Sequence, residues 1–164
     1  MKYKALLFGS IGTLIESSNI QRNSFNEAFK EAGLDWYWYE KDYKILLKKS
    51  GGTKRVEDFA EKNNTNVNAS QIRNRKTEIF SSFIIKNKQK LRKSVDEIIK
   101  YTKDNNIKLA FSTSTTLNNV DAVFESLSGQ ISKEEFEFIG NKSLVKNEKP
   151  HPEIYKVTLD KLNL

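Results

Sequence analysis

The side chains available for chemistry in this sequence are carboxylates, hydroxyls, lysines and arginines. The chain of 164 residues has no cysteine and a single histidine. It therefore offers no disulfide, no thiolate nucleophile, no cysteine-bound metal and no multi-histidine zinc site. Two stretches of small or hydroxyl-bearing residues follow β-like runs, Gly9-Ser10-Ile11-Gly12 after residues 3–8 and Ser112-Thr113-Ser114-Thr115-Thr116 after residues 107–111. What these stretches can do depends on the elements that hold them.

Those elements are a short strand, a helical block and a region where helices and strands alternate. Residues 3–8 (YKALLF) are typical of a strand that ends at glycines. From about 16 to 88, apolar residues recur at helical spacing and no strand pattern interrupts them. Further strands are predicted at 107–111 and near 136–139, with helices before, between and after them. The candidate N-cap residues of the helices are Ser17, Ser18 or Asn19, then Asn68 or Ser70, then Ser94.

This order predicts an α/β core with parallel strands, interrupted after its first strand by a helical subdomain. We expect residues 1–15 and 89–164 to form the core and residues 16–88 to form the insertion. A chain of about 150 residues buries roughly 70% of its unfolded surface, and 37% of this one is hydrophobic. The sequence therefore predicts a globular protein with one inserted subdomain.

The formal net charge of +7 raises the question of nucleic-acid binding. Most of the 28 cationic residues are lysines rather than the arginines favoured for phosphate recognition, and they are spread along the chain. We interpret the excess as a solvated surface and expect no nucleic-acid partner. No segment is long and apolar enough for a membrane span or a signal peptide, so we expect a cytoplasmic protein.

Four features, in order and spacing, resemble the haloacid dehalogenase superfamily. The similarity is greatest to its branch of CbbY-like and β-phosphoglucomutase-like proteins, whose four-helix cap is inserted after the first core strand. The matching stretches are 6–14 (LLFGSIGTL), the cap signatures at 21–29, 32–38 and 51–55, then 109–116 (LAFSTSTT) and 149–155 (KPHPEIY). The resemblance implies a Rossmann-like core with a parallel sheet and a helical cap.

The chemistry that the resemblance implies is phosphoryl transfer through two aspartates. In an Asp-x-Asp-Gly-Thr motif, the first aspartate attacks phosphorus and the second acts as general acid and base. Here Gly12 and Thr13 match, but Gly9 stands in place of the nucleophile and Ile11 in place of the acid/base. Neither residue can do that work, so we expect a catalytically deficient protein.

The resemblance also implies Mg²⁺, held by the first aspartate, a backbone carbonyl and an acidic motif on a later strand. Gly9 supplies no carboxylate, and the sequence ends at Leu164 before such a strand. We therefore expect no metal cofactor and a core that lacks its C-terminal strands. The strand at 3–8 would then lie at an exposed sheet edge, open to a second copy or to a partner chain.

Other positions keep the residue types that the resemblance assigns to ligand binding. Thr113 and the backbone N–H of Ser114 would hold a phosphoryl group, and Lys149 would neutralise it. In the cap, the loop with Gly52, Lys54 and Arg55 resembles the one that reaches the far end of a phosphorylated sugar. We expect a phosphate anion or a phosphorylated small molecule to bind there.

Three functions remain open. The first is a pseudoenzyme that binds a phosphorylated ligand without turnover. The second is an active Mg²⁺-dependent hydrolase of phosphorylated metabolites, with a non-standard or partner-completed site. The third is a structural or assembly subunit that uses the exposed sheet edge.

Simpler interpretations of the candidate residues also stay open. Thr113 could cap a helix, and Lys54 and Arg55 could be solvated side chains. Trp36 and Trp38 are interpreted as core and rim aromatics rather than a stacking platform.

Overall fold

The chain forms two compact units, and each is described by itself. The computed structural model describes residues 3–49 and 51–164. One unit contains the chain up to Ser17 together with Ile84–Leu164, and the other is Ser18–Phe83. Ser50-Gly51-Gly52 predicts the end of a helix near Lys49, and Ser50 itself lies outside the described residues. Within these ranges, no helix combines the length and the apolar character that crossing a membrane requires.

A three-stranded parallel sheet lies at the centre of the first unit. Its strands β1 (Ala5–Phe8), β2 (Lys108–Ser112) and β3 (Phe138–Gly140) lie in the order β1-β2-β3. Phe8 pairs with Phe111, and Ser112 pairs with Gly140. The middle strand is buried along nearly its whole length, as expected for a parallel sheet covered on both faces. The predicted parallel α/β fold is confirmed.

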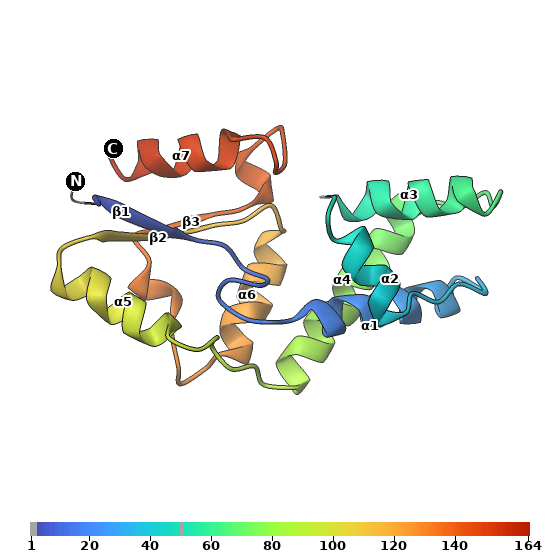
Figure 1. Cartoon of the computed structure of the whole chain (residues 1–164), viewed down its shortest axis with the longest axis horizontal. Helices are drawn as coiled ribbons and strands as arrows, with labels where there is room; N and C mark the ends of the chain where they lie inside the picture. Colours follow the sequence, from blue (N-terminus) through green and yellow to red (C-terminus); the bar gives the residue numbers. More distant parts are fainter. Residues whose placement is uncertain (1–2, 50) are drawn as a thin grey trace. The chain divides into compact units, whose positions relative to one another are not determined.

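Helices cover both faces of this sheet. Figure 1 shows α7 (Glu153–Lys161) along one face and α5 (Val95–Asp104) and α6 (Leu117–Ser126) on the other. Two short 3₁₀ helices, Lys133–Glu135 and Lys142–Leu144, flank β3. Phe111 contacts Phe124 and Phe136 edge-on, at centroid distances of 5.4 and 5.8 Å. These rings form the core between the sheet and α6.

The second unit is helical. It contains α1 (Ser18–Glu31), α2 (Glu40–Leu46), α3 (Gly52–Lys62) and α4 (Ala69–Lys86), the last of which runs on into the first unit. Trp38 is buried and packs on Phe25 and Phe29, with centroid distances of 4.8 and 4.7 Å. The amide of Asn26 exchanges two hydrogen bonds with the backbone of Trp38, at 3.1 and 2.8 Å. The interpretation of Trp38 as a core aromatic is confirmed.

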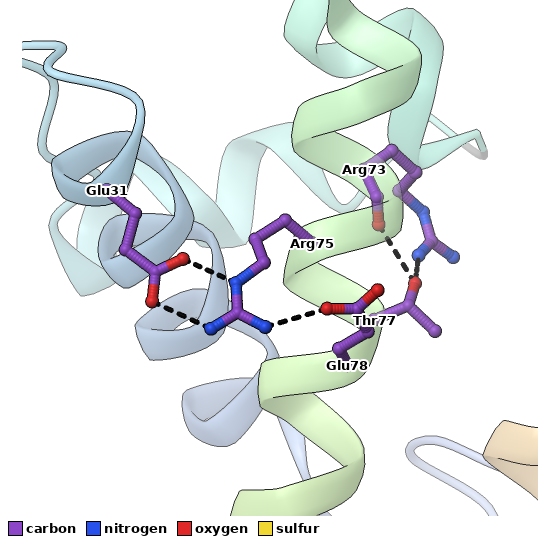
Figure 2. Close-up of polar contacts among 5 residues, drawn as sticks. All are labelled: Glu31, Arg73, Arg75, Thr77 and Glu78. Carbon is purple, nitrogen blue, oxygen red and sulfur yellow. Dashed lines mark hydrogen bonds and ion pairs between the residues drawn. The ribbon is translucent and has the colours of Figure 1, made fainter.

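An arginine on α4 ties that helix to α1. Arg75 donates to Glu31 from Nη2 at 2.9 Å and to Glu78 from Nη1 at 2.7 Å. Figure 2 shows its guanidinium between the two carboxylates, while Arg73 extends from the same helix and bonds to Thr77. The hydrogen bonds to Arg75 lower the pKa of the Glu31 carboxyl.

The predicted helix caps have mixed outcomes. Asn68 accepts a hydrogen bond from the backbone of Gln71 at 3.0 Å, so this cap is confirmed. Ser94 precedes α5, but its side chain makes no capping bond and its φ is 66°, so that prediction is wrong. The left-handed backbone there is not the extended conformation that an N-cap normally adopts. Ser17 does not cap α1 either, because its hydroxyl is buried without a partner.

Candidate functional site

The carboxyl ends of the three parallel strands meet at one edge of the sheet. Gly9 follows β1, Thr113 and Ser114 follow β2, and Asn141 follows β3. The register places Gly9 next to Ser112, because Phe8 pairs with Phe111. Ligands of open α/β sheets bind outside this edge. Three of the sequence-predicted residues, Thr113, Ser114 and Lys149, lie together at this edge. Gly9 follows the neighbouring strand.

The turn at residues 9–13, directly after β1, contains no acidic side chain. Gly12 has a φ of +74° and donates from its backbone to Ile15 at 2.7 Å. Gly9 lies outside the left-handed region, so its backbone does not require glycine. A Cβ placed on Gly9 would lie 3.3 Å from Thr13 Oγ1. The side chain of Ile11 is 42% exposed and offers neither a proton nor a hydrogen-bond acceptor.

The loop after β2 is held by hydrogen bonds that leave its hydroxyls in defined places. Thr113 is buried, donates from its backbone to Gly140 at 3.1 Å, and accepts from the backbone of Thr115 at 3.3 Å. The cap of α6 is Thr116, whose hydroxyl accepts from Asn119 N at 3.4 Å. The interpretation of Thr113 as the cap of this helix is therefore wrong.

Lys149 crosses the end of β2. Its Nζ donates to the carbonyl oxygen of Ser112 at 2.9 Å and lies 4.5 Å from the centre of the Tyr155 ring. Its backbone N–H donates to Ser114 Oγ at 3.0 Å, which joins the two loops. No ion pair to Lys149 exists within residues 3–49 and 51–164. This sheet edge therefore carries an ammonium group without a neutralising carboxylate.

The remaining candidates, Gly52, Lys54 and Arg55, belong to the first turn of α3 in the helical unit. Lys54 is exposed and pairs with Asp58 at 2.7 Å. Arg55 donates to the carbonyls of Leu46 at 3.1 Å and Lys49 at 2.8 Å. Burial lowers the pKa of the Arg55 guanidinium. The interpretation of Arg55 as a freely solvated side chain is therefore wrong, because it joins α3 to the end of α2.

A cluster of cations near the start of α3 was missed by the sequence prediction. Lys76 is only 2% exposed, with Nζ 4.7 Å from the Phe80 ring. Burial, together with the charges of Arg73 and Arg55, lowers its pKa well below the usual value. Burial raises the pKa of the neighbouring Tyr43, against the opposing charges of Arg55, Arg73 and Arg22. No carboxylate of the described chain is among the groups that act on either side chain.

A sequence signal for Lys76 does exist. The residue stands on the face of α4 defined by Ile72, Ile79 and Phe80, where helical periodicity predicts an apolar side chain. A lysine at such a position is expected to bury at least the aliphatic part of its side chain against the core. Gly52 lies against this cluster, since a Cβ there would clash with the Arg73 side chain. Glycine at 52 thus permits Arg73 to lie against the first turn of α3.

The family follows from a match that covers most of the chain. The model of the haloacid dehalogenase-like hydrolases matches residues 11–164. The chain belongs to the haloacid dehalogenase-like hydrolase family. The resemblance found in the sequence is confirmed.

Relatives of this haloacid dehalogenase-like chain include CbbY proteins. Protein CbbY of Rhodobacter capsulatus is 34% identical over 167 residues, which span 100% of this chain and 74% of the relative. A structure of CbbY from Rhodobacter sphaeroides with phosphate is 31% identical, with a TM-score of 0.87. A variant of the same protein with xylulose-1,5-bisphosphate has a TM-score of 0.86 at 31% identity. Each structural match covers 99% of this chain and 74% of the other.

The residues at the sheet edge do not fit the Mg²⁺ that the family implies. Mg²⁺ is held by hard oxygen ligands, one or two of them carboxylates, and the donors here are hydroxyls, carbonyls and an ammonium group. Within the described ranges, no three histidine, cysteine, aspartate or glutamate side chains gather as a metal site. No step of the function proposed below depends on a metal.

Proposed function

We propose that this haloacid dehalogenase-like protein binds a phosphorylated small molecule and does not hydrolyse it. The observation that carries the proposal is Gly9 at the carboxyl end of β1, beside the Thr113 loop. Covalent phosphoryl transfer in the family needs a carboxylate at this place, and glycine has no side chain to phosphorylate. Ile11 cannot replace the general acid and base.

Binding is supported by the groups that remain at the sheet edge. Lys149 supplies positive charge at the end of β2, and the buried hydroxyl of Thr113 lies in the adjoining loop. The α6 helix begins directly after this loop, so its N-terminal end favours an anion. Structures of CbbY from Rhodobacter sphaeroides hold phosphate or a sugar bisphosphate, which supports the same ligand class here.

The buried cations of the helical unit support a second anionic contact. Lys76 is buried, and burial together with the charges of Arg73 and Arg55 lowers its pKa. Arg73 lies against the first turn of α3 at Gly52. Arginine and lysine in such a position bind phosphate oxygens through charge-assisted hydrogen bonds.

Family membership by itself favours an alternative, an active hydrolase of phosphorylated metabolites that uses a non-standard nucleophile. The two candidates for that nucleophile are poorly suited. Ser10 is 8% exposed, and Glu16 is held by Arg92, whose Nη1 lies 3.3 Å from its carboxylate. Turnover of a phosphorylated substrate distinguishes this alternative from the proposal.

Calorimetric titration with inorganic phosphate, sugar monophosphates and sugar bisphosphates tests the binding function. We expect saturable binding without Mg²⁺, weakened at least about tenfold in Lys149→Met because a charge-assisted contact is lost. Lys156→Met is the matched control, since Lys156 is an exposed cation on α7. Equal affinities for all three proteins would contradict the proposed site.

A further inference from the structure

A groove runs along the helical unit between α2 and α3. Its volume is about 780 Å³, within the range of roughly 300–1,000 Å³ typical of small-molecule sites. It is separate from the sheet edge described above, and of its lining residues only Lys54 and Arg55 are candidates for the phosphate ligand. The aromatic and apolar side chains that line it include Tyr37, Trp38, Tyr39, Ile45 and Phe59.

The walls of the groove expose large apolar side chains. Tyr37 is 55% exposed, Tyr39 64% and Ile45 59%. The two tyrosines lie edge to face, with their ring centroids 4.9 Å apart. Single exposed apolar residues are ordinary, but a group of them around one hollow marks a binding site.

The floor of the groove contains a buried polar group without a partner. Trp38 lines the groove and is 1% exposed, and its indole N–H has no hydrogen-bond acceptor in the protein. Buried tryptophan N–H groups usually find an acceptor. The groove is therefore lined by a residue whose hydrogen-bond donor is unsatisfied within the protein.

The rim of the groove is cationic. Lys48, Lys49 and Lys62 line it and form no ion pair within the described chain, whereas Lys54 is neutralised by Asp58. Asp42 is the other carboxylate at the rim. Cations therefore outnumber carboxylates around an apolar floor, and an anionic ligand complements this arrangement.

We propose that the groove binds a small anionic amphiphile, a molecule with an aromatic or apolar body and a carboxylate, sulfonate or phosphate group. The body would lie on Tyr37, Tyr39 and Ile45, and the acidic group would lie at Lys48, Lys49 and Lys62. This site goes beyond the proposed function, because it needs neither Lys149 nor Thr113 nor any residue of the sheet.

The probe that tests this inference is 8-anilinonaphthalene-1-sulfonate, with uncharged N-phenyl-1-naphthylamine as its matched neutral analogue. Both tryptophans lie in the helical unit, so energy transfer from tryptophan reports binding there. We expect one saturable site for the sulfonate. Lys62→Glu should weaken sulfonate binding about fivefold or more, the size of a surface charge effect, and leave the neutral analogue unchanged.

Two further variants make the test specific. Ile45→Asp should abolish binding of both probes, while Lys41→Glu, an exposed change on α2 outside the groove, should have no effect. Circular dichroism and cooperative thermal unfolding establish that each variant is folded. The indole N–H resonance of Trp38, assigned with Trp36→Phe, should shift on addition of the sulfonate.

Three results of the binding experiments would overturn the inference. They are several weak sites of equal affinity, binding unaffected by Ile45→Asp in a folded protein, and an unchanged Trp38 resonance at saturation. A concentration-dependent dimer that Ile45→Asp abolishes would also overturn it, because the groove would then be occupied by a second copy of the chain. Loss of phosphate binding in Lys149→Met leaves the inference intact, so the two proposals fail independently.

Discussion

A side chain at position 9 would point at the hydroxyl of Thr13. The Cβ of such a side chain lies 3.3 Å from Thr13 Oγ1, a contact that a shift of a few tenths of an ångström relieves. The fold therefore leaves space for a Cβ where the sequence has Gly9. The missing nucleophile is a matter of the residue type at this position, because the backbone around it does not exclude aspartate.

Restoring that carboxylate should leave the protein folded. Gly9→Asp, alone or with Ile11→Asp, is expected to change the free energy of unfolding by about 1 kcal/mol or less, as for surface substitutions without a clash. Urea unfolding followed by circular dichroism measures the change. A loss of several kcal/mol would show that the β1 loop does not accommodate the side chain, and the comparison of position 9 with the family motif would then be wrong.

Gly140, at the end of β3, has less space for a side chain than Gly9 has. A Cβ there would lie 2.9 Å from Thr158 Oγ1 and 3.0 Å from Ile154 Cδ1. Gly140→Ala is expected to destabilise the protein by about 1–3 kcal/mol, because α7 must move away from the sheet. Gly9→Ala is the matched control and should have a much smaller effect in the same urea titration. Equal effects would contradict the close approach of α7 to β3.

The burial of Lys76 predicts that the free energy of unfolding depends on pH. Its folded-state pKa lies well below its unfolded value, so the unfolded chain binds more protons between the two values and stability rises with pH there. Lys76→Met should be more stable than the parent near pH 7, because methionine can occupy the buried site without the cost of burying an ammonium group. The difference should shrink as the pH approaches 10.5, the ordinary lysine value.

Urea unfolding of both proteins from pH 6 upward measures that difference. Lys156→Met, which removes an exposed lysine, should show no comparable change with pH. If Lys76→Met is less stable than the parent at neutral pH, then the ammonium group is stabilising and the account of its burial is wrong. The same variant should bind sugar bisphosphates more weakly if the cation cluster holds an anion.

The ion pairs of Arg75 predict a stability that is lost in acid. Hydrogen bonds from Arg75 lower the folded-state pKa of the Glu31 carboxyl. These bonds therefore contribute to the free energy of unfolding at pH values above 4.5, the ordinary pKa, and the contribution is lost as the pH falls through the lowered pKa. Arg75→Gln should therefore destabilise the protein slightly near pH 7 and not at all at the acid end. Thermal unfolding at several pH values and salt concentrations measures this. If the difference in stability between Arg75→Gln and the parent did not change with pH or with salt concentration, an electrostatic role of Arg75 would be contradicted.

The sequence predicted the fold through local periodicity and turn residues. The runs 3–8 and 107–111 became β1 and β2 because they are apolar and end at glycines or hydroxyl residues, and Gly33 follows α1 with a φ of +69°. Ser94 was mispredicted because its residue type favours a cap while its backbone is left-handed. The packing of the chain sets that conformation, and residue type alone does not reveal it.

The candidate site was predictable only in part. Thr113, Ser114 and Lys149 were predicted from their resemblance to family motifs, and the structure brings Lys149 against Ser112 and Ser114. Their role in ligand binding stays a prediction. Arg73 and Lys76 were missed, since their burial depends on how α4 packs against α1 and the start of α3. The bonds from Arg55 to two carbonyls at the end of α2 likewise follow from tertiary structure.

The most direct test of the central claim is phosphate release from a panel of sugar phosphates and bisphosphates, with and without Mg²⁺. Thr113→Val and Lys149→Ala serve as controls for contaminating phosphatases. The account predicts release at background level, equal in all three proteins, under conditions where the parent binds the ligand. Release above background that both variants lose would contradict it, and would show that another residue replaces the carboxylate missing at Gly9.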